Sequence, residues 1–192
     1  MIEELKLVGL LDDERVAFFE AIKPSDAGSF HSAGARGVYE SHRQLVTEAA
    51  ENDESVLILE DDCSFTARAL TFTSDSQWDI FYGGYWAKNP HDLENSDIQE
   101  SHIMGFSARG AKLLADYLHN LEFEGIHPSI DAAYVWFRRK YPYVPTLFAT
   151  PPLAYQRPSR SDIAPKPWDR FALTRGLAAN LRKVRASLKA GH

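Results

Sequence analysis

Residues 55–62 read S-V-L-I-L-E-D-D, a short apolar run that ends abruptly in three carboxylates. A continuous apolar run of this length is typical of a strand that is buried on both faces. Ligands of open α/β sheets bind beyond the carboxyl ends of the strands, which is where this acidic triplet stands. The segment therefore predicts an α/β fold with polar chemistry at the end of a central strand.

Outward from this segment, apolar runs alternate with stretches of helical periodicity. Ser41-His42-Arg43-Gln44 fits the capping-box pattern and predicts a helix that begins at Ser41, after a Gly- and Ser-rich loop. The other expected helices are 1–11, 108–121, 130–139 and 169–189, and the other expected strands are 15–21, 79–82, 102–106 and 146–149. Alternation of this kind predicts a layered α/β domain over residues 1–165, with a mostly parallel central sheet flanked by helices.

The composition is that of a globular protein. The 192 residues are 44% hydrophobic and 25% charged, which is enough chain to bury a core without disulfides. Cys63 is the only cysteine, so an internal disulfide and a multi-cysteine zinc site are excluded. We see no secretory signal and no apolar run long enough to cross a membrane. These features predict a cytoplasmic protein, with the inner face of the membrane as the alternative place.

The charge is divided unevenly. Residues 1–165 carry 14 Lys and Arg against 26 Asp and Glu, a balance of −12, whereas residues 166–192 carry seven basic residues against one acidic residue, a balance of +6. An acidic body repels phosphate backbones, so we expect no nucleic acid partner.

The acidic triplet is the sharpest candidate site. Residues i and i+2 of a strand share a side, so Glu60 and Asp62 can converge while Asp61 points away. A cation among the three carboxylates would relieve their repulsion, and oxygen ligands suit Mn²⁺ or Mg²⁺. The alternative is a polar turn that caps a strand.

Two further candidates precede or begin helices. Gly37, Ser41 and His42 lie at the expected start of a helix, whose unpaired N–H groups suit a phosphate, but Ser41 can equally be a simple cap. Asp131 lies in the first turn of another helix, where it can act as a general base or only as a favourable partner of the helix dipole.

A Pro-rich loop near residue 160 gathers polar groups. Gln156, Arg160, Ser161 and Asp162 lie in it, and an Arg side chain can bind phosphate with two parallel hydrogen bonds. The alternative is an ordinary surface loop.

Taken together, these stretches resemble glycosyltransferase family 25, the lipopolysaccharide-biosynthesis and collagen-galactosyltransferase group. The resemblance rests on F-F-E-A-I (18–22), G-A-R-G-V-Y-E-S-H (34–42), V-L-I-L-E-D-D (56–62), D-I-F-Y-G-G (79–84), G-F-S-A-R-G-A-K-L-L (105–114), I-D-A-A-Y-V-W-F-R (130–138) and Y-Q-R-P-S-R-S-D-I (155–163). The S-H pair and the L-I-L-E-D-D signature at this separation are quite specific.

The resemblance implies a GT-A-like (Rossmann-like) fold, a nucleotide-sugar donor, Mn²⁺ (or Mg²⁺), and transfer of a hexose, often galactose, with inversion. The acceptor would be a glycan or a lipid-linked molecule of lipopolysaccharide type. The resemblance assigns Asp62 and Glu60 to the metal, Asp131 to general base catalysis, and a nucleotide-sugar site, with a UDP-sugar favoured, to Gly37, Ser41, His42, Glu60, Asp61, Gln156, Arg160, Ser161 and Asp162.

The chain departs from the family pattern at its beginning. Family members usually open with a strand of the form I-N-L and a basic D-R segment, whereas Met1 here falls inside the helix that follows. Either the start is misassigned, the chain is trimmed, or part of the donor pocket is lacking. In the last case we expect poor nucleotide affinity and an unprotected edge in the sheet. A non-catalytic relative and a nucleotide-sugar hydrolase therefore remain alternatives.

The end of the chain is basic and amphipathic. Leu173, Leu177, Leu181, Val184 and Leu188 recur at helical spacing, with Arg and Lys on the other faces. We expect the segment 166–192 to be a helix that packs on the domain or on a second subunit in a homodimer. The alternative is a surface helix that contacts anionic lipid.

Overall fold

The computed structural model describes residues 1–157. Its helices are α1 (Ile2–Leu7), α2 (Ala33–Asn52), α3 (Ala108–His119) and α4 (Ile130–Lys140), with a 3₁₀ turn at Ala67–Leu70. The expected basic helix over 166–192, and the candidate residues Arg160, Ser161 and Asp162, lie outside the described residues. No helix among residues 1–157 is both long and apolar enough to cross a membrane.

Four strands form the main sheet in the order β1-β4-β3-β5, which confirms a mixed α/β fold. Their bounds are Val56–Leu59 for β1, Ile80–Ala87 for β3, Ile98–Phe106 for β4 and Thr146–Phe148 for β5. A second sheet pairs β2 (Cys63–Phe65) with β6 (Ala154–Gln156) in antiparallel fashion.

The prediction of a mostly parallel sheet is wrong. Strand β4 runs antiparallel to both of its neighbours, β1 and β3, and only the pair of β3 and β5 is parallel. The reason lies in the connection between β3 and β4, residues 88–97, which contains no helix. A connection of this kind returns the chain as an antiparallel neighbour, whereas a parallel neighbour needs a crossover, usually a helix.

Strand β1 lies at an edge of the sheet. Among the described residues it pairs with β4 alone, from Val56 opposite Phe106 to Leu59 opposite Ile103. The expectation that β1 is buried on both faces is also wrong, because Leu57 is 51% exposed while Ile58 is buried. The apolar run fits a central strand, but within residues 1–157 its actual position leaves Leu57 exposed and one edge unpaired.

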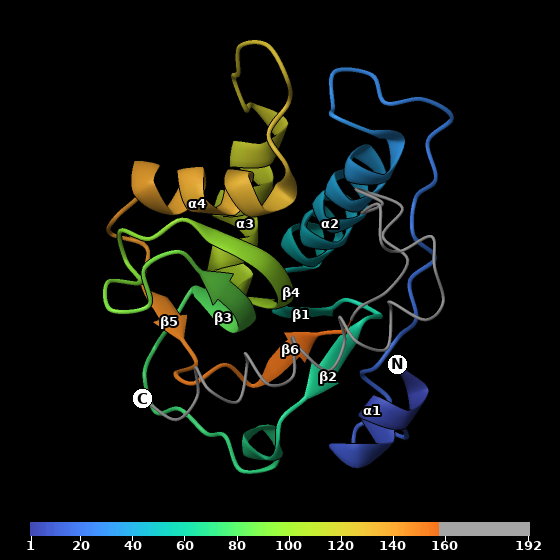
Figure 1. The fold of residues 1–192 in the computed structure, drawn as a ribbon, viewed down its shortest axis with the longest axis vertical. Coiled ribbons are helices and arrows are strands. Elements are labelled where there is room, and N and C mark those ends of the chain that lie inside the picture. Colours follow the sequence, from blue (N-terminus) through green and yellow to red (C-terminus); the bar gives the residue numbers. More distant parts are fainter. Residues whose placement is uncertain (158–192) are drawn as a thin grey trace, which may run out of the picture.

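The two faces of the main sheet are covered differently. Helices α2, α3 and α4 lie on one side, and the β2–β6 sheet lies on the other (Figure 1). The larger core cluster joins Ile58, Met104 and Phe106 of the sheet to residues of the helices such as Val46 and Leu114. A smaller cluster joins Phe81 and Ile103 to Cys63, Leu153 and Ala154 on the opposite face. Side chains therefore alternate between two cores along β4.

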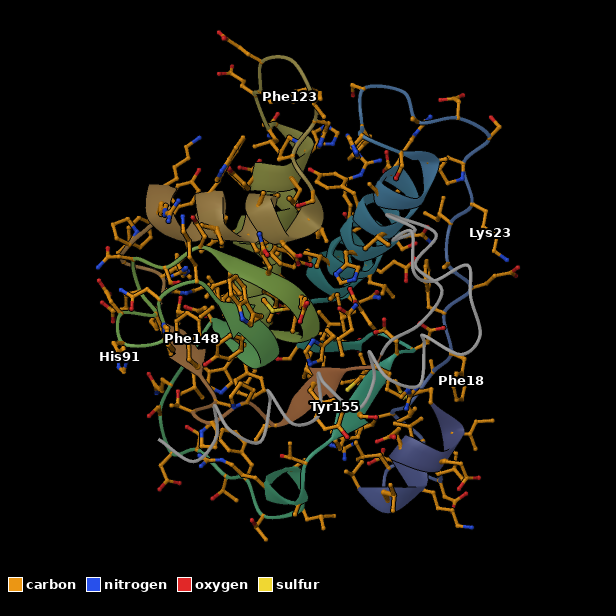
Figure 2. The ribbon with its side chains drawn as sticks, viewed as in Figure 1. Phe18, Lys23, His91, Phe123, Phe148 and Tyr155 are labelled. Atoms are coloured by element: carbon orange, nitrogen blue, oxygen red, sulfur yellow. The ribbon has the colours of Figure 1, made fainter. Side chains whose placement is uncertain are left out.

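Helix α2 begins eight residues before the predicted start. Ser32 is its N-cap and accepts a hydrogen bond from Ala35 N at 3.1 Å, so Ser41 lies inside the helix. The strand expected over 15–21 does not form. That segment links α1 to α2 along the outside of the molecule, as the labelled Phe18 and Lys23 show (Figure 2).

Candidate functional site

The acidic triplet forms a tight turn at the end of β1. Glu60 N donates to His102 O at 3.0 Å, which extends the pairing with β4 by one residue, and Cys63 N then donates to Glu60 O at 3.1 Å. The turn sends the carboxylates to different partners, so the prediction that Glu60 and Asp62 converge is wrong. Glu60 faces α2, Asp62 faces β6, and Asp61 is exposed.

Glu60 meets His42 on the helical side of the sheet. Its Oε1 lies 3.6 Å from His42 Nε2, and the imidazole is almost completely buried. The other ring nitrogen, Nδ1, lies 2.8 Å from the hydroxyl oxygen of Tyr134 on α4. Burial keeps the pKa of Tyr134 well above its usual value, so the hydroxyl stays neutral. A hydroxyl that donates to Nδ1 leaves the ring proton on Nε2, facing the Glu60 carboxylate.

Asp131 lies in the first turn of α4, one turn before Tyr134. Its two carboxylate oxygens accept hydrogen bonds from the backbone of β4, Oδ2 from Glu100 N at 3.2 Å and Oδ1 from Ser101 N at 3.3 Å. Glu100 adopts a left-handed conformation, with φ of 55°, where these bonds begin. Strained backbone of this kind tends to occur at sites that the surrounding structure holds firmly.

Burial is the main cause that raises the pKa of Asp131, and the nearby negative charge of Glu60 raises it further. Hydrogen bonds from Ser101 and the proximity of His42 oppose the shift. These interactions bring three predicted site residues into one electrostatic cluster, which we call the His42–Glu60–Asp131 cluster. Its members come from α2, from the end of β1 and from α4.

Asp62 and Gln156, two other predicted site residues, also meet. Gln156 Nε2 donates to Asp62 Oδ2 at 2.9 Å, at the end of the β2–β6 sheet. The next residue, Arg157, holds the acidic turn through its backbone N on Asp62 O at 2.7 Å and its guanidinium on Asp61 O at 2.6 Å. The acidic turn is thereby fixed to the end of β6.

Gly37 and Ser41 have packing roles that the sequence analysis missed. Ser41 Oγ donates to Gly37 O at 2.7 Å and accepts from Ile22 N at 2.9 Å. A Cβ at Gly37 would lie 2.5 Å from Ile22 O, so glycine permits this close approach. The predicted phosphate-binding helix start at Ser41 is therefore wrong, because the backbone N–H groups there are inside α2.

The carboxylates of the acidic turn meet the requirements of a divalent cation only in part. The described residues contain no group of three His, Cys, Asp or Glu side chains placed to share an ion. Glu60 faces His42 and Asp62 faces Gln156, so the structure does not bring these two carboxylates onto one ion. A single carboxylate also suits Mg²⁺ or Mn²⁺ when phosphate oxygens complete the coordination.

Tyr134, Glu100 and Ser101 were not among the predicted site residues. Tyr134 could have been found, because it follows Asp131 by three residues and shares its helix face. The roles of Glu100 and Ser101 could not, because both act through backbone N–H groups.

Comparison with family models, with curated proteins and with solved structures finds no match to this chain.

Proposed function

We propose that this chain is a metal-dependent glycosyltransferase of family 25 type with a GT-A-like fold. It transfers a hexose, with galactose as the first candidate, from a nucleotide sugar to a hydroxyl of a glycan or lipopolysaccharide-type acceptor, with inversion. The observation that carries the proposal is the His42–Glu60–Asp131 cluster, because three residues far apart in sequence meet at the end of β1.

In this proposal Asp131 is the general base. Two backbone N–H groups orient its carboxylate, and its raised pKa improves the carboxylate as a proton acceptor. The acceptor hydroxyl gives its proton to Asp131 while its oxygen bonds to the anomeric carbon of the sugar. The bond from that carbon to the diphosphate breaks on the opposite face, and the nucleoside diphosphate leaves with the electron pair. A single displacement of this kind inverts the anomeric configuration.

The donor side of the site centres on the acidic turn. Asp62 is the proposed ligand of Mn²⁺ or Mg²⁺, with phosphate oxygens of the donor in the remaining positions, and Glu60, which faces α2, would be a second ligand or a ribose contact. When bound, the ion would offset the charge of the departing diphosphate. Gln156 holds one oxygen of Asp62, and His42 faces Glu60, so both fix the carboxylates before the donor arrives. Arg160, Ser161 and Asp162 stay in the proposal on the resemblance alone.

A second candidate is a non-catalytic relative that binds a donor or a partner without turnover. The observation in its favour is the open edge of β1, next to the proposed donor site. An incomplete sheet at that place would weaken the binding of a nucleotide.

Calorimetric titration of the full chain with UDP-sugars, with and without Mn²⁺, tests the proposal. We expect binding that requires Mn²⁺ and is lost in Asp62→Ala. Asp53→Asn is the matched control, because Asp53 ends α2 on the surface in a left-handed conformation that Asn accepts. Transfer to a glycan acceptor separates the enzyme from the non-catalytic relative. Absence of binding of every nucleoside diphosphate, with and without Mn²⁺, would overturn the proposal.

A further inference from the structure

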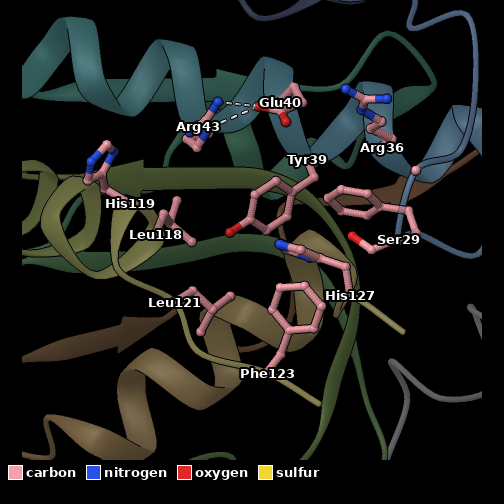
Figure 3. A pocket seen from close by; sticks show the side chains of 12 residues that line it. Ser29, Arg36, Tyr39, Glu40, Arg43, Leu118, His119, Leu121, Phe123 and His127 are labelled. Carbon is pink, nitrogen blue, oxygen red and sulfur yellow. Dashed lines mark hydrogen bonds and ion pairs between the residues drawn. The ribbon is translucent and has the colours of Figure 1, made fainter. Parts of the chain in front are cut away.

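A cavity of about 400 Å³ lies beside the first turns of α2, on the side facing the end of α3 and the loop that follows it (Figure 3). Its walls come from the loop 28–30, from α2, and from residues 118–127. None of its lining residues belongs to the His42–Glu60–Asp131 cluster. Binding at this cavity therefore does not depend on the proposed function.

The cavity is locally basic in an acidic protein. Arg36 and Arg43 line it together with His119 and His127, and among residues 1–157 Glu40 is the only acidic lining residue. Arg36 Nη1 lies 2.7 Å from Asp26 Oδ1, and Arg43 Nη2 lies 2.6 Å from Glu40 Oε2. Each guanidinium has five N–H donors, so one ion pair leaves further donors for a ligand. The remaining charged N–H donors of the two guanidinium groups favour a ligand that accepts hydrogen bonds, and an anionic group accepts them most strongly.

Tyr39 gives the cavity an unsatisfied polar group. The residue is only 2% exposed, and its hydroxyl has no hydrogen-bond partner among the described residues. Burial raises the pKa of Tyr39 to about 12, so the hydroxyl keeps its proton. Figure 3 shows it pointing toward the space between Leu118 and His127. A buried hydroxyl without a partner is unfavourable, and a ligand oxygen would supply the missing partner.

The opposite wall is aromatic. The ring of His127 stacks on Phe30 with centroids 4.0 Å apart and packs against Phe123 at 4.3 Å, while Tyr39 meets it edge-on at 4.5 Å. His127 Nδ1 lies 2.9 Å from Pro128 O, which fixes the ring. Phe30, Phe123 and His127 are only half-buried, so they leave an apolar surface beside the cations.

We infer that this cavity binds a sugar ring that carries an anionic group, either a carboxylate or a phosphate. Arg36 binds the anion, the aromatic wall covers one face of the ring, and Arg43, Glu40 and Tyr39 hydrogen-bond to sugar hydroxyls. Glu40 also orients Arg43 through their ion pair, and its carboxylate can accept hydrogen bonds from the hydroxyls of the ligand. The volume is within the range of small-molecule sites.

A neighbouring cavity of about 420 Å³ fixes the orientation of the ligand. It shares Glu40, Arg43 and His119 with the first cavity, but Glu48 and Glu51 also line it. Its carboxylates repel an anion, so the anionic group belongs at the Arg36 end and hydroxyls belong toward the acidic end.

Titration of the full chain with glucuronate, glucose 6-phosphate and glucose, followed by amide NMR, tests the inference. We expect a charged sugar to change the amide chemical shifts of residues 28–43 and 118–127. The affinity for glucose should be at least about tenfold weaker than for the charged sugars. Arg36→Gln and Arg43→Gln should each weaken binding about tenfold or more. Lys112→Gln, which removes a surface cation of α3 that is paired with Asp53 at the end of α2, should leave the affinity unchanged.

The two charged sugars identify the source of the anion. A preference for glucuronate supports a carboxylated ligand, and a preference for glucose 6-phosphate supports a phosphorylated one. Equal binding of glucose, affinity that does not change in both arginine variants, or no binding of any of the three sugars would overturn the inference.

Tyr39→Phe tests the inference with a variant whose expected result, weaker binding without loss of stability, cannot arise from misfolding. The variant removes a hydroxyl that has no partner in the unliganded protein, so its melting temperature should not fall. Its affinity for the charged sugar should nevertheless be about fivefold weaker. A lower melting temperature together with unchanged affinity would overturn the role assigned to this hydroxyl.

Discussion

His42 Nδ1 lies 2.8 Å from the Tyr134 hydroxyl oxygen, and this contact ties α2 to α4 inside the core. Both side chains are buried, so neither can exchange its partner for water. The contact also fixes which face of the imidazole ring meets Glu60. The orientation of His42 within the His42–Glu60–Asp131 cluster therefore depends on Tyr134, which is not a member of the cluster.

Tyr134→Phe should lower the free energy of unfolding by about 1–2 kcal/mol, because it leaves a buried imidazole nitrogen without its partner. Urea denaturation measures the effect. Tyr143→Phe is the control, since Tyr143 is largely exposed, and it should change stability by less than about 0.5 kcal/mol. Equal effects of the two substitutions would contradict the assigned contact.

Asp131→Asn should lower the rate of the proposed transfer by about 10²–10⁴, the usual contribution of a general base. It should also change how stability varies with pH. Folding raises the pKa of Asp131 above 3.8, so the stabilisation from its protonated form is fully present below pH 3.8 and is lost as the pH rises through the folded value.

An asparagine stays neutral, so the stability of the variant relative to the native protein should rise from about pH 4 toward pH 7. Its single oxygen satisfies fewer of the backbone donors, which adds an offset that does not depend on pH. Urea unfolding at several pH values measures both the pH-dependent difference in stability and the constant offset. Asp116→Asn, on the exposed surface of α3, is the control. Parallel stability curves for the native protein and Asp131→Asn would refute the raised pKa.

Glu4→Ala should destabilise the protein by about 2–3 kcal/mol. Glu4 accepts from Phe65 N at 2.8 Å and from Arg157 Nη1 at 2.9 Å, so it holds α1 against the acidic turn and the end of β6. Glu3→Ala changes an exposed neighbour in the same helix and should have little effect. Denaturation and limited proteolysis of the segment after α1 measure the difference, and equal behaviour of the two variants would exclude this role.

Gly37→Ala should destabilise the protein by about 1–3 kcal/mol, because the new Cβ would lie 2.5 Å from Ile22 O. Helix propensity acts in the opposite direction and favours alanine by about 1 kcal/mol. The sign of the change in unfolding free energy therefore separates close packing from propensity. An alanine variant that is more stable than the native protein would rule out the close contact.

The sequence predicted the elements with long or strongly periodic patterns. The helices expected near 108–121 and 130–139 appear as α3 and α4 with shifted ends, and the apolar runs near 79–82 and 102–106 lie in β3 and β4. The side chains of β4 do not predict whether it pairs parallel or antiparallel with its neighbours, because an apolar run has the same pattern in both chain directions. Strands β2 and β6, with three residues each, are too short to show a period.

The candidate site was predictable in its residue types more than in its geometry. His42, Glu60 and Asp131 stand in separate motifs of the sequence, and only the packing of α2 and α4 on the sheet brings them together. The prediction of a helix start at Ser41 is wrong, because the sequence does not distinguish a serine within a helix from a serine at its cap. Here Ser41 bonds back to Gly37 O, four residues earlier, and Ser32 provides the cap.

Because β1 pairs with β4 on one side, the residues of β1 differ in whether their backbone N–H and C=O groups face β4. The bond from Glu60 N to His102 O sets the antiparallel alternation, so Ile58 directs its backbone groups to β4 and Leu57 and Leu59 direct theirs outward. Hydrogen–deuterium exchange should therefore alternate along four residues, slow at Ile58 and fast at the two leucines. The same alternation gives an incoming extended peptide a row of donors and acceptors with the spacing of a fifth strand.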